Sequence, residues 1–142
     1  MVDIVQTLID LAGGIVPEDW NGDSMKAYLA DGSIPWKDYA LSEYYGHNIA
    51  SGITMIRQKE WKYVYHNRIR DLPPDRELFN LREDPKELHN LADIPKYREK
   101  IQELHKLLVK ELGEDPDAIE TRYLRTHRWT LRITRIIKKW FA

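Results

Sequence analysis

The chain has 142 residues, 42% of them hydrophobic and 32% charged, with a formal net charge of −1, a composition that suits one globular domain. Because it contains no cysteine, disulfide scaffolds, zinc–thiolate sites and a cysteine nucleophile are excluded for these residues. It has neither a basic start with a long apolar run nor a stretch of roughly 18 apolar residues, so we expect no signal peptide and no membrane span in this sequence.

The first thirty residues favour two helices. Residues 2–12 carry apolar side chains at helical spacing, with acids on the other side. The glycine pair at 13–14 is expected to end this helix, because glycine accepts the left-handed conformation of a C-terminal cap. A short second helix is predicted to run through Leu29, with Asp23 or Ser24 as its N-terminal cap.

The pattern then changes to short runs rich in aromatic and β-branched residues, which favour strands. We predict four strands, at Tyr39–Tyr45, Gly52–Gln58, Glu60–His66 and Arg76–Leu81. Residues 58–60 make a tight turn, so the second and third strands form a hairpin. The prolines in 72–75 indicate a loop before the fourth strand. The expected result is a small antiparallel sheet of about four strands.

Helical spacing returns after the sheet. Asp84, Pro85 and Glu87 suit the start of a helix that ends near Asn90. A stronger helix is predicted after Pro95 and ends at Gly113. Its apolar face consists of Tyr97, Ile101, Leu104 and Leu108. The predicted fold class is therefore α+β, with helices packed against one face of the sheet.

Residues 116–142 are predicted to form a basic amphipathic helical tail, separate from a domain at 1–115. From residue 117 onward seven basic residues face two acids, which gives the tail a net charge of +5 and leaves −6 for the rest. The basic stripe suits an anionic polysaccharide, an anionic membrane surface or non-specific nucleic acid, although no recognised motif for specific nucleic-acid binding accompanies it. Alternatively, the apolar stripe covers the domain and the arginines meet its acids.

Three segments in chain order share a further pattern. Residues 2–13 and 22–25 read VDIVQTLIDLAG and GDSM, 55–64 read MIRQKEWKYV, and 77–92 read ELFNLREDPKELHNLA. Together they resemble the C-terminal part of sulfatases of the arylsulfatase or choline-sulfatase type, whose segments read D-I-x-P-T-L-x-x-L-A-G with G-x-S-L, R-x-x-x-W/Y-K-Y, and E-L-Y/F-D-L-x-x-D-P-x-E-x-x-N-L-A. Gln6 stands where the family usually has proline, and Asn80 where it usually has aspartate.

The resemblance implies an alkaline-phosphatase-like sulfate ester hydrolase. Its nucleophile, in a C/S-x-P-S/A-R motif, and its carboxylate-bound calcium would lie in an N-terminal catalytic domain before Met1. The similar string Ser33–Lys37 departs from the motif at Trp36 and Lys37, so we expect it to be a turn. This chain is then expected to have no catalytic residue, metal site or cofactor of its own and to be inactive alone. The parent enzyme is compatible with cytoplasm or periplasm.

The candidate substrate-binding residues lie at the end of the first predicted strand and in the loop that follows it, which contains Gly46. They are Glu43, Tyr44, Tyr45, His47 and Asn48. Polar groups at a strand end are well placed to face a cleft, and in the family the matching region borders the substrate pocket. The alternative is that one tyrosine packs in the core and the remaining polar residues form a solvated turn. Arg57 and Lys62 invite a sulfate-binding role, but strand-surface charges paired with Glu60 are the favoured explanation.

Three functions remain open at this point. The first is the C-terminal subdomain of a sulfatase, whose partner would be the missing N-terminal domain or, through exposed apolar surface, a second copy of the chain. The second is a free-standing binding module that holds an anionic polymer on the basic tail. The third is an unrecognised hydrolase built around Glu43 and His47.

Overall fold

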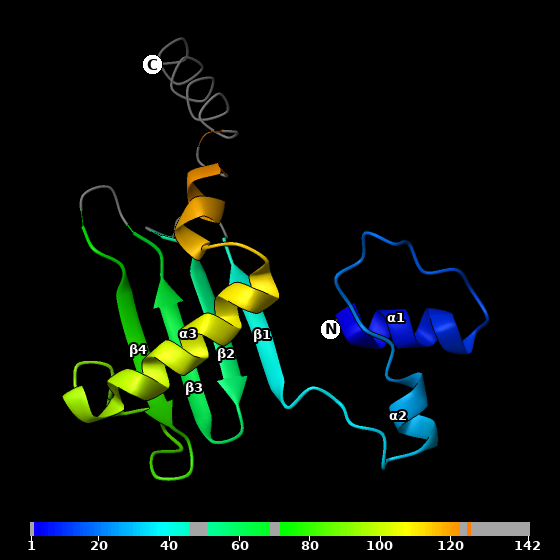
Figure 1. Cartoon of the computed structure of the whole chain (residues 1–142), viewed down its shortest axis with the longest axis horizontal. Coiled ribbons are helices and arrows are strands. Elements are labelled where there is room, and N and C mark those ends of the chain that lie inside the picture. Colours follow the sequence, from blue (N-terminus) through cyan, green and yellow to red (C-terminus); the bar gives the residue numbers. More distant parts are fainter. Residues whose placement is uncertain (1, 46–50, 69–71, 123–124, 126–142) are drawn as a thin grey trace, which may run out of the picture. The chain divides into compact units, whose positions relative to one another are not determined.

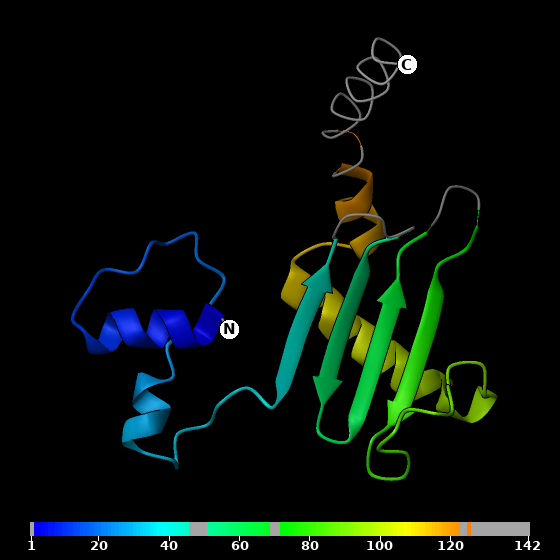
Figure 2. The same ribbon diagram turned by 180° about the vertical axis from the view of Figure 1, so that it is seen from behind.

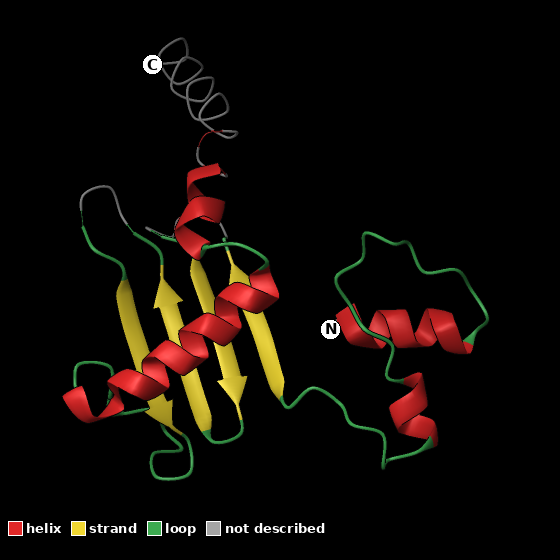
Figure 3. Cartoon of the chain, viewed as in Figure 1, coloured by secondary structure: helices red, strands yellow, loops and turns green. Residues whose placement is uncertain are grey.

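The computed structural model describes residues 2–45, 51–68, 72–122 and 125. The chain divides into two compact units, which we call the N-terminal unit (Met1–Asp38) and the sheet unit (Tyr39–Ala142). The N-terminal unit holds two helices, and the sheet unit holds an antiparallel sheet crossed by one long helix (Figures 1 and 3). This confirms the α+β prediction. The elements are α1 (Val2–Leu11), α2 (Lys26–Ala30), β1 (Tyr39–Tyr44), β2 (Ile53–Gln58), β3 (Trp61–His66), β4 (Asp75–Asn80), the 3-10 helix η1 (Pro95–Tyr97) and α3 (Arg98–Leu112).

The glycine pair ends α1 as predicted. Gly13 has a φ of 74°, in the left-handed region. Its N–H donates to the carbonyl of Asp10 at 3.2 Å, and the N–H of Gly14 donates to the carbonyl of Ile9 at 2.9 Å. These two bonds satisfy carbonyls that the end of a helix otherwise leaves unpaired. The local sequence therefore determines where this helix stops.

The predicted cap of α2 is matched only in part. The helix begins at Lys26 with Met25 at its cap position, and Met25 makes no side-chain capping hydrogen bond. The hydroxyl of Ser24 accepts the backbone N–H of Lys26 at 3.3 Å and donates to the carboxylate of Asp10, 2.7 Å away in α1. Ser24 thus joins the start of α2 to α1.

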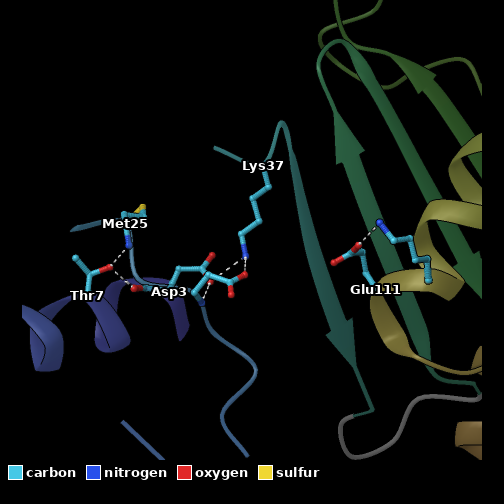
Figure 4. A network of polar contacts seen from close by, with 7 residues as sticks. Asp3, Thr7, Met25, Lys37 and Glu111 are labelled. Atoms are coloured by element: carbon cyan, nitrogen blue, oxygen red, sulfur yellow. Dashed lines mark hydrogen bonds and ion pairs between the residues drawn. The ribbon is translucent and has the colours of Figure 1, made fainter. Parts of the chain in front are cut away.

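A polar network holds the N-terminal unit together (Figure 4). The ammonium group of Lys37 lies 3.0 Å from carboxylate oxygens of both Asp3 and Asp23. Asp3 also accepts the backbone N–H of Asp23 at 2.8 Å, and the hydroxyl of Thr7 accepts the N–H of Met25 at 2.9 Å. These contacts attach the loop after α1 and the turn before β1 to the first two turns of α1.

The sheet is a four-stranded antiparallel meander in the order β1-β2-β3-β4. Each strand begins and ends within one residue of its predicted bounds. The hairpin between β2 and β3 turns at Lys59, whose φ of 52° is left-handed although it is not a glycine. The register places Leu41 opposite Ile56, Ile56 opposite Tyr63, and Tyr63 opposite Leu78. These side chains therefore form one row across a single face of the sheet.

The core lies between that face and α3, which runs across it in Figure 1 and lies behind the sheet in Figure 2. The predicted apolar stripe of α3 supplies Ile101, Leu104 and Leu108, all buried. Ile56, Tyr63, Tyr65 and Leu78 face them from the sheet. Gly113, with a φ of 75°, ends α3 as expected.

The predicted helix at 84–90 is wrong, because these residues form turns. Asp84 accepts the backbone N–H of His89 at 2.8 Å, as a cap would, but Glu87 adopts a left-handed φ of 55° that ends any helix. Asn90 then covers the free edge of β4: its side chain accepts the N–H of Leu78 at 3.0 Å and donates to the carbonyl of Arg76 at 3.1 Å. Covering an edge strand in this way prevents pairing with other chains.

None of the helices among the described residues is long and apolar enough to cross a membrane.

Candidate functional site

The candidate residues Glu43, Tyr44 and Tyr45 lie at the end of β1, while His47 and Asn48 fall outside the described residues. Glu43 is opposite Thr54 in the register, on the face of the sheet that carries α3. Tyr44 points to the other face and is 55% exposed. Tyr45 is half-buried. The structure therefore brings three of the five candidates to one end of the sheet, but on different faces.

Tyr45 packs against the backbone of Gly52 at the start of β2. A Cβ on Gly52 would lie 2.3 Å from the Cε1 atom of the tyrosine ring, so only glycine leaves room for this ring. Burial raises the pKa of Tyr45, and the nearby carboxylates of Glu43 and Glu120 raise it further. Tyr45 thus sits in a partly enclosed, acidic environment.

A cluster of buried polar side chains adjoins Tyr45, and we call it the polar cluster: Thr54, Asn67 and Glu120. All three are at least nine-tenths buried. Glu120 accepts the N–H of Gly52 at 3.2 Å, and Asn67 donates to the carbonyl of Pro116 at 2.6 Å. One oxygen of each side chain, Thr54 Oγ1, Asn67 Oδ1 and Glu120 Oε2, has no hydrogen-bond partner among the described residues. The cluster joins residues 116–122, which are helical, to the end of the sheet.

Two carboxyl groups near this end have raised pKa values. Partial desolvation raises the pKa of Glu43, although the residue as a whole is solvent-exposed. Burial raises the pKa of Glu120, and the charge of Asp117 acts in the same direction, while the N–H of Gly52 opposes them. Such raised values are typical of carboxyl groups in clefts that handle protons or polar ligands, and of carboxyl groups with a purely structural role.

A second set of titratable groups fixes α3 and the following helical turn on the sheet. The hydroxyl of Tyr63 is 3.2 Å from Nδ1 of His105, and that of Tyr65 donates to Asp117 at 3.2 Å. Burial raises the pKa of Tyr63 to about 12 and lowers the pKa of His105, which nearby Arg76 lowers further. Both tyrosines are therefore neutral, Tyr65 donates to Asp117, and these contacts hold α3 and the following helical turn on the sheet.

The described residues contain no group of three or more His, Cys, Asp or Glu side chains arranged to hold a metal ion. Lys62 is paired with Glu87, a partner that the sequence did not suggest, and Arg57 is exposed on the face of the sheet away from α3. The end of the sheet carries tyrosine and carboxyl side chains, with Glu43 and Tyr44 on opposite faces.

Reasoning from the sequence missed the polar cluster. Glu120 was expected only as an acid opposing the charge of the basic tail, and Asn67 and Thr54 carry no motif. The signal that was available is Gly52 at the start of a predicted strand, since an isolated glycine there indicates a close approach. Of the predicted tail, residues 116–122 are helical, and Arg122 pairs with Glu114. Apart from Arg125, which is exposed, its basic amphipathic stripe lies outside the described residues.

Comparison with known proteins matches residues 1–114 to the family model "N-sulphoglucosamine sulphohydrolase, C-terminal". The chain is similar to arylsulfatase K of Danio rerio, with 37% identity over 76% of this chain and 21% of the relative. It is also similar to an arylsulfatase of Clostridium perfringens, with 32% identity over 78% and 22% of the two chains. Among solved structures, one described as bound to its substrate D-glucosamine-2-N,6-O-disulfate matches with a TM-score of 0.65 and 27% identity, over 81% of this chain and 25% of that one.

The chain thus spans between a fifth and a quarter of the length of these relatives.

Proposed function

This chain belongs to the family of N-sulphoglucosamine sulphohydrolase C-terminal domains, and we propose that it is the C-terminal part of a sulfuric ester hydrolase. In this proposal the chain packs on a catalytic domain, borders the substrate pocket of that domain and is inactive alone. The observation that carries the proposal is the N-terminal unit, which has helices but no apolar core. The end of the family match at residue 114 supports a boundary between 115 and 116.

The N-terminal unit cannot bury its own apolar side chains. Thr7 is the one buried residue of α1. Ile9 is half-buried, but the other apolar side chains of α1 are more than two-fifths exposed: Val2, Ile4, Val5, Leu8 and Leu11. A unit of this size that lacks disulfides and a core does not stay folded by burial alone. An amphipathic helix with its apolar face in water therefore calls for a covering surface, which the catalytic domain would provide.

The sheet unit has a second uncovered face. Among the described elements, α3 covers one side of the sheet, and Figure 2 shows the other side of β1 and β2 with no helix over it. Tyr44 and Arg57 are exposed there, and Met55 is half-buried. A mixture of aromatic, apolar and arginine side chains is typical of protein interfaces. This face is a second surface suited to the same catalytic domain.

The rim from Glu43 to Asn48 would supply contacts to the substrate. One similar solved protein is described with a disulfated glucosamine as its substrate, and other relatives are named arylsulfatases. A sulfated sugar carries hydroxyl donors that Glu43 and the tyrosines would accept. The resemblance implies that the calcium and the nucleophile belong to the catalytic domain, and the described residues of this chain contain no group of side chains that could hold a metal ion.

The isolated chain tests this proposal. We expect no hydrolysis of 4-nitrophenyl sulfate, strong fluorescence of a hydrophobic dye, and self-association in sedimentation. A compact monomer that binds no dye and hydrolyses the ester would overturn the proposal, and with it the assignment of this chain as an accessory part.

A further inference from the structure

A cleft of about 520 Å³ lies between the free edge of β4 and the start of α3. Its floor and walls include three prolines, Pro73, Pro74 and Pro95, with Ala92, Ile94 and Ile101. In Figure 3, β4 is the outer strand on the side where α3 begins, so the cleft is at the opposite edge of the sheet from Glu43. A volume in the range of about 300–1,000 Å³ suits a small ligand.

Two arginines, Arg76 in β4 and Arg98 in the first turn of α3, line this cleft. Both are exposed. Among the ion pairs of the described residues, none involves either arginine, although Asp75 and Asp93 line the same cleft. Two guanidinium groups at one cleft without carboxylate partners are free to bind an anion, and their planar N–H groups match the oxygens of a sulfate or carboxylate.

The cleft is also partly preorganised. The guanidinium carbon of Arg76 lies 5.9 Å from the centre of the Tyr65 ring, so a cation–π contact restrains the side chain. The carbonyl of Arg76 is held by Asn90, which fixes the strand edge beside the cleft. Asp93, which is exposed, and the second oxygen of Asp75 remain available as acceptors for hydroxyl groups.

We propose that this cleft binds one sulfated sugar residue, with its sulfate group on Arg76 and Arg98 and its hydroxyl groups on Asp75 and Asp93. The combination selects the ligand class, because arginines alone suit any anion, whereas acids beside them suit a ligand that also carries hydroxyl donors. The proline and isoleucine side chains would pack on the apolar face of the ring. This site goes beyond the docking role and does not depend on it, since all of its residues belong to the sheet unit.

Titration of the 142-residue chain with N-acetylglucosamine 6-sulfate, followed by backbone amide NMR, tests the proposal. We expect saturable shifts centred on Ala92, Ile94 and Gln102, and much weaker responses to unsulfated N-acetylglucosamine and to inorganic sulfate. The variant Arg76→Ala/Arg98→Ala should bind at least about tenfold more weakly, which corresponds to about 1.4 kcal/mol. The matched control Arg57→Ala/Arg82→Ala removes the same charge outside the cleft and should bind within about twofold of the unchanged chain.

Several results would overturn the site. One is equal weakening by the control, which would make the effect one of net charge. Another is equal binding of inorganic sulfate or of the unsulfated sugar, which would remove the assigned ligand class. Shifts centred on Tyr44 would move the site elsewhere. If the alanine variant does not fold, Arg76→Lys/Arg98→Lys keeps the charge but loses the planar donors, and unchanged affinity of that variant rejects the two guanidinium groups as the binding residues.

Discussion

Replacing Leu8 on α1 by alanine tests whether the exposed face of this helix is an interface. Leu8 is 61% exposed in the structure. Full burial of a leucine side chain contributes about 1.5–3 kcal/mol, so covering the exposed part would contribute roughly 1–2 kcal/mol. Alanine keeps the helix propensity. In the isolated chain we therefore expect a change in unfolding free energy within about 0.5 kcal/mol.

The loss should appear only where a catalytic domain covers α1. A chimera that carries residues 1–114 in place of the matched segment of the Clostridium perfringens arylsulfatase provides that surface. In urea unfolding of the chimera, Leu8→Ala should cost roughly 1–2 kcal/mol, a factor of about 5–30 in the folded population. The matched control is Leu88→Ala, in the turn after β4, where the side chain is 71% exposed. Equal effects of the two variants, or none from Leu8→Ala, would refute the reasoning.

Four further predictions concern the sheet unit. Leu104 is fully buried, so Leu104→Ala should lower its unfolding free energy by about 2–5 kcal/mol in urea; a loss below about 1 kcal/mol would contradict the described core. Gly52→Ala should cost about 1–3 kcal/mol because its Cβ meets the Tyr45 ring, and Tyr45→Ala in the same chain should recover most of the loss. The pKa of Glu120 is raised on folding, so its contribution to stability is present at pH 4 and decreases as the pH rises past its unfolded pKa. The melting temperature of Glu120→Gln should therefore equal that of the unchanged chain at pH 4 and be higher than it at pH 8. A lower melting temperature of the variant at pH 8 would contradict this. In the chimera, Glu43→Ala should raise the KM for a sulfated sugar roughly fivefold with little change in kcat, whereas the neighbouring Ser42→Ala should leave both KM and kcat unchanged. Equal kinetics of the two variants would reject Glu43 as a substrate contact.

Local sequence was sufficient for much of the fold. Short runs rich in aromatic and β-branched residues predicted the strands of the sheet, and glycine at 13 and 113 predicted where α1 and α3 stop, because backbone conformation at these points depends on one or two residues. The differences occurred where tertiary contacts compete with local ones. Ser24 bonds to Asp10 of α1 as well as to the N–H of Lys26, and Glu87 turns left-handed and pairs with Lys62.

The candidate site was only partly predictable. Position at a strand end was enough to bring Glu43, Tyr44 and Tyr45 together, but their faces depend on where the pairing of β1 stops. The polar cluster joins residues 54, 67 and 120, which are far apart in sequence and belong to no motif. The cleft at β4 is similar, since Arg76 and Arg98 line one cleft although they lie 22 positions apart, and Asn90 holds the returning chain at the strand edge between them.

The most direct test of the accessory role is hydrolysis of 4-nitrophenyl sulfate by three proteins in parallel: the isolated 142-residue chain, the Clostridium perfringens enzyme truncated before the matched segment, and the chimera that joins them. The proposed function predicts no turnover by either part alone and measurable turnover by the chimera. Turnover by the isolated chain, or a truncated enzyme as active and stable as the chimera, would contradict it.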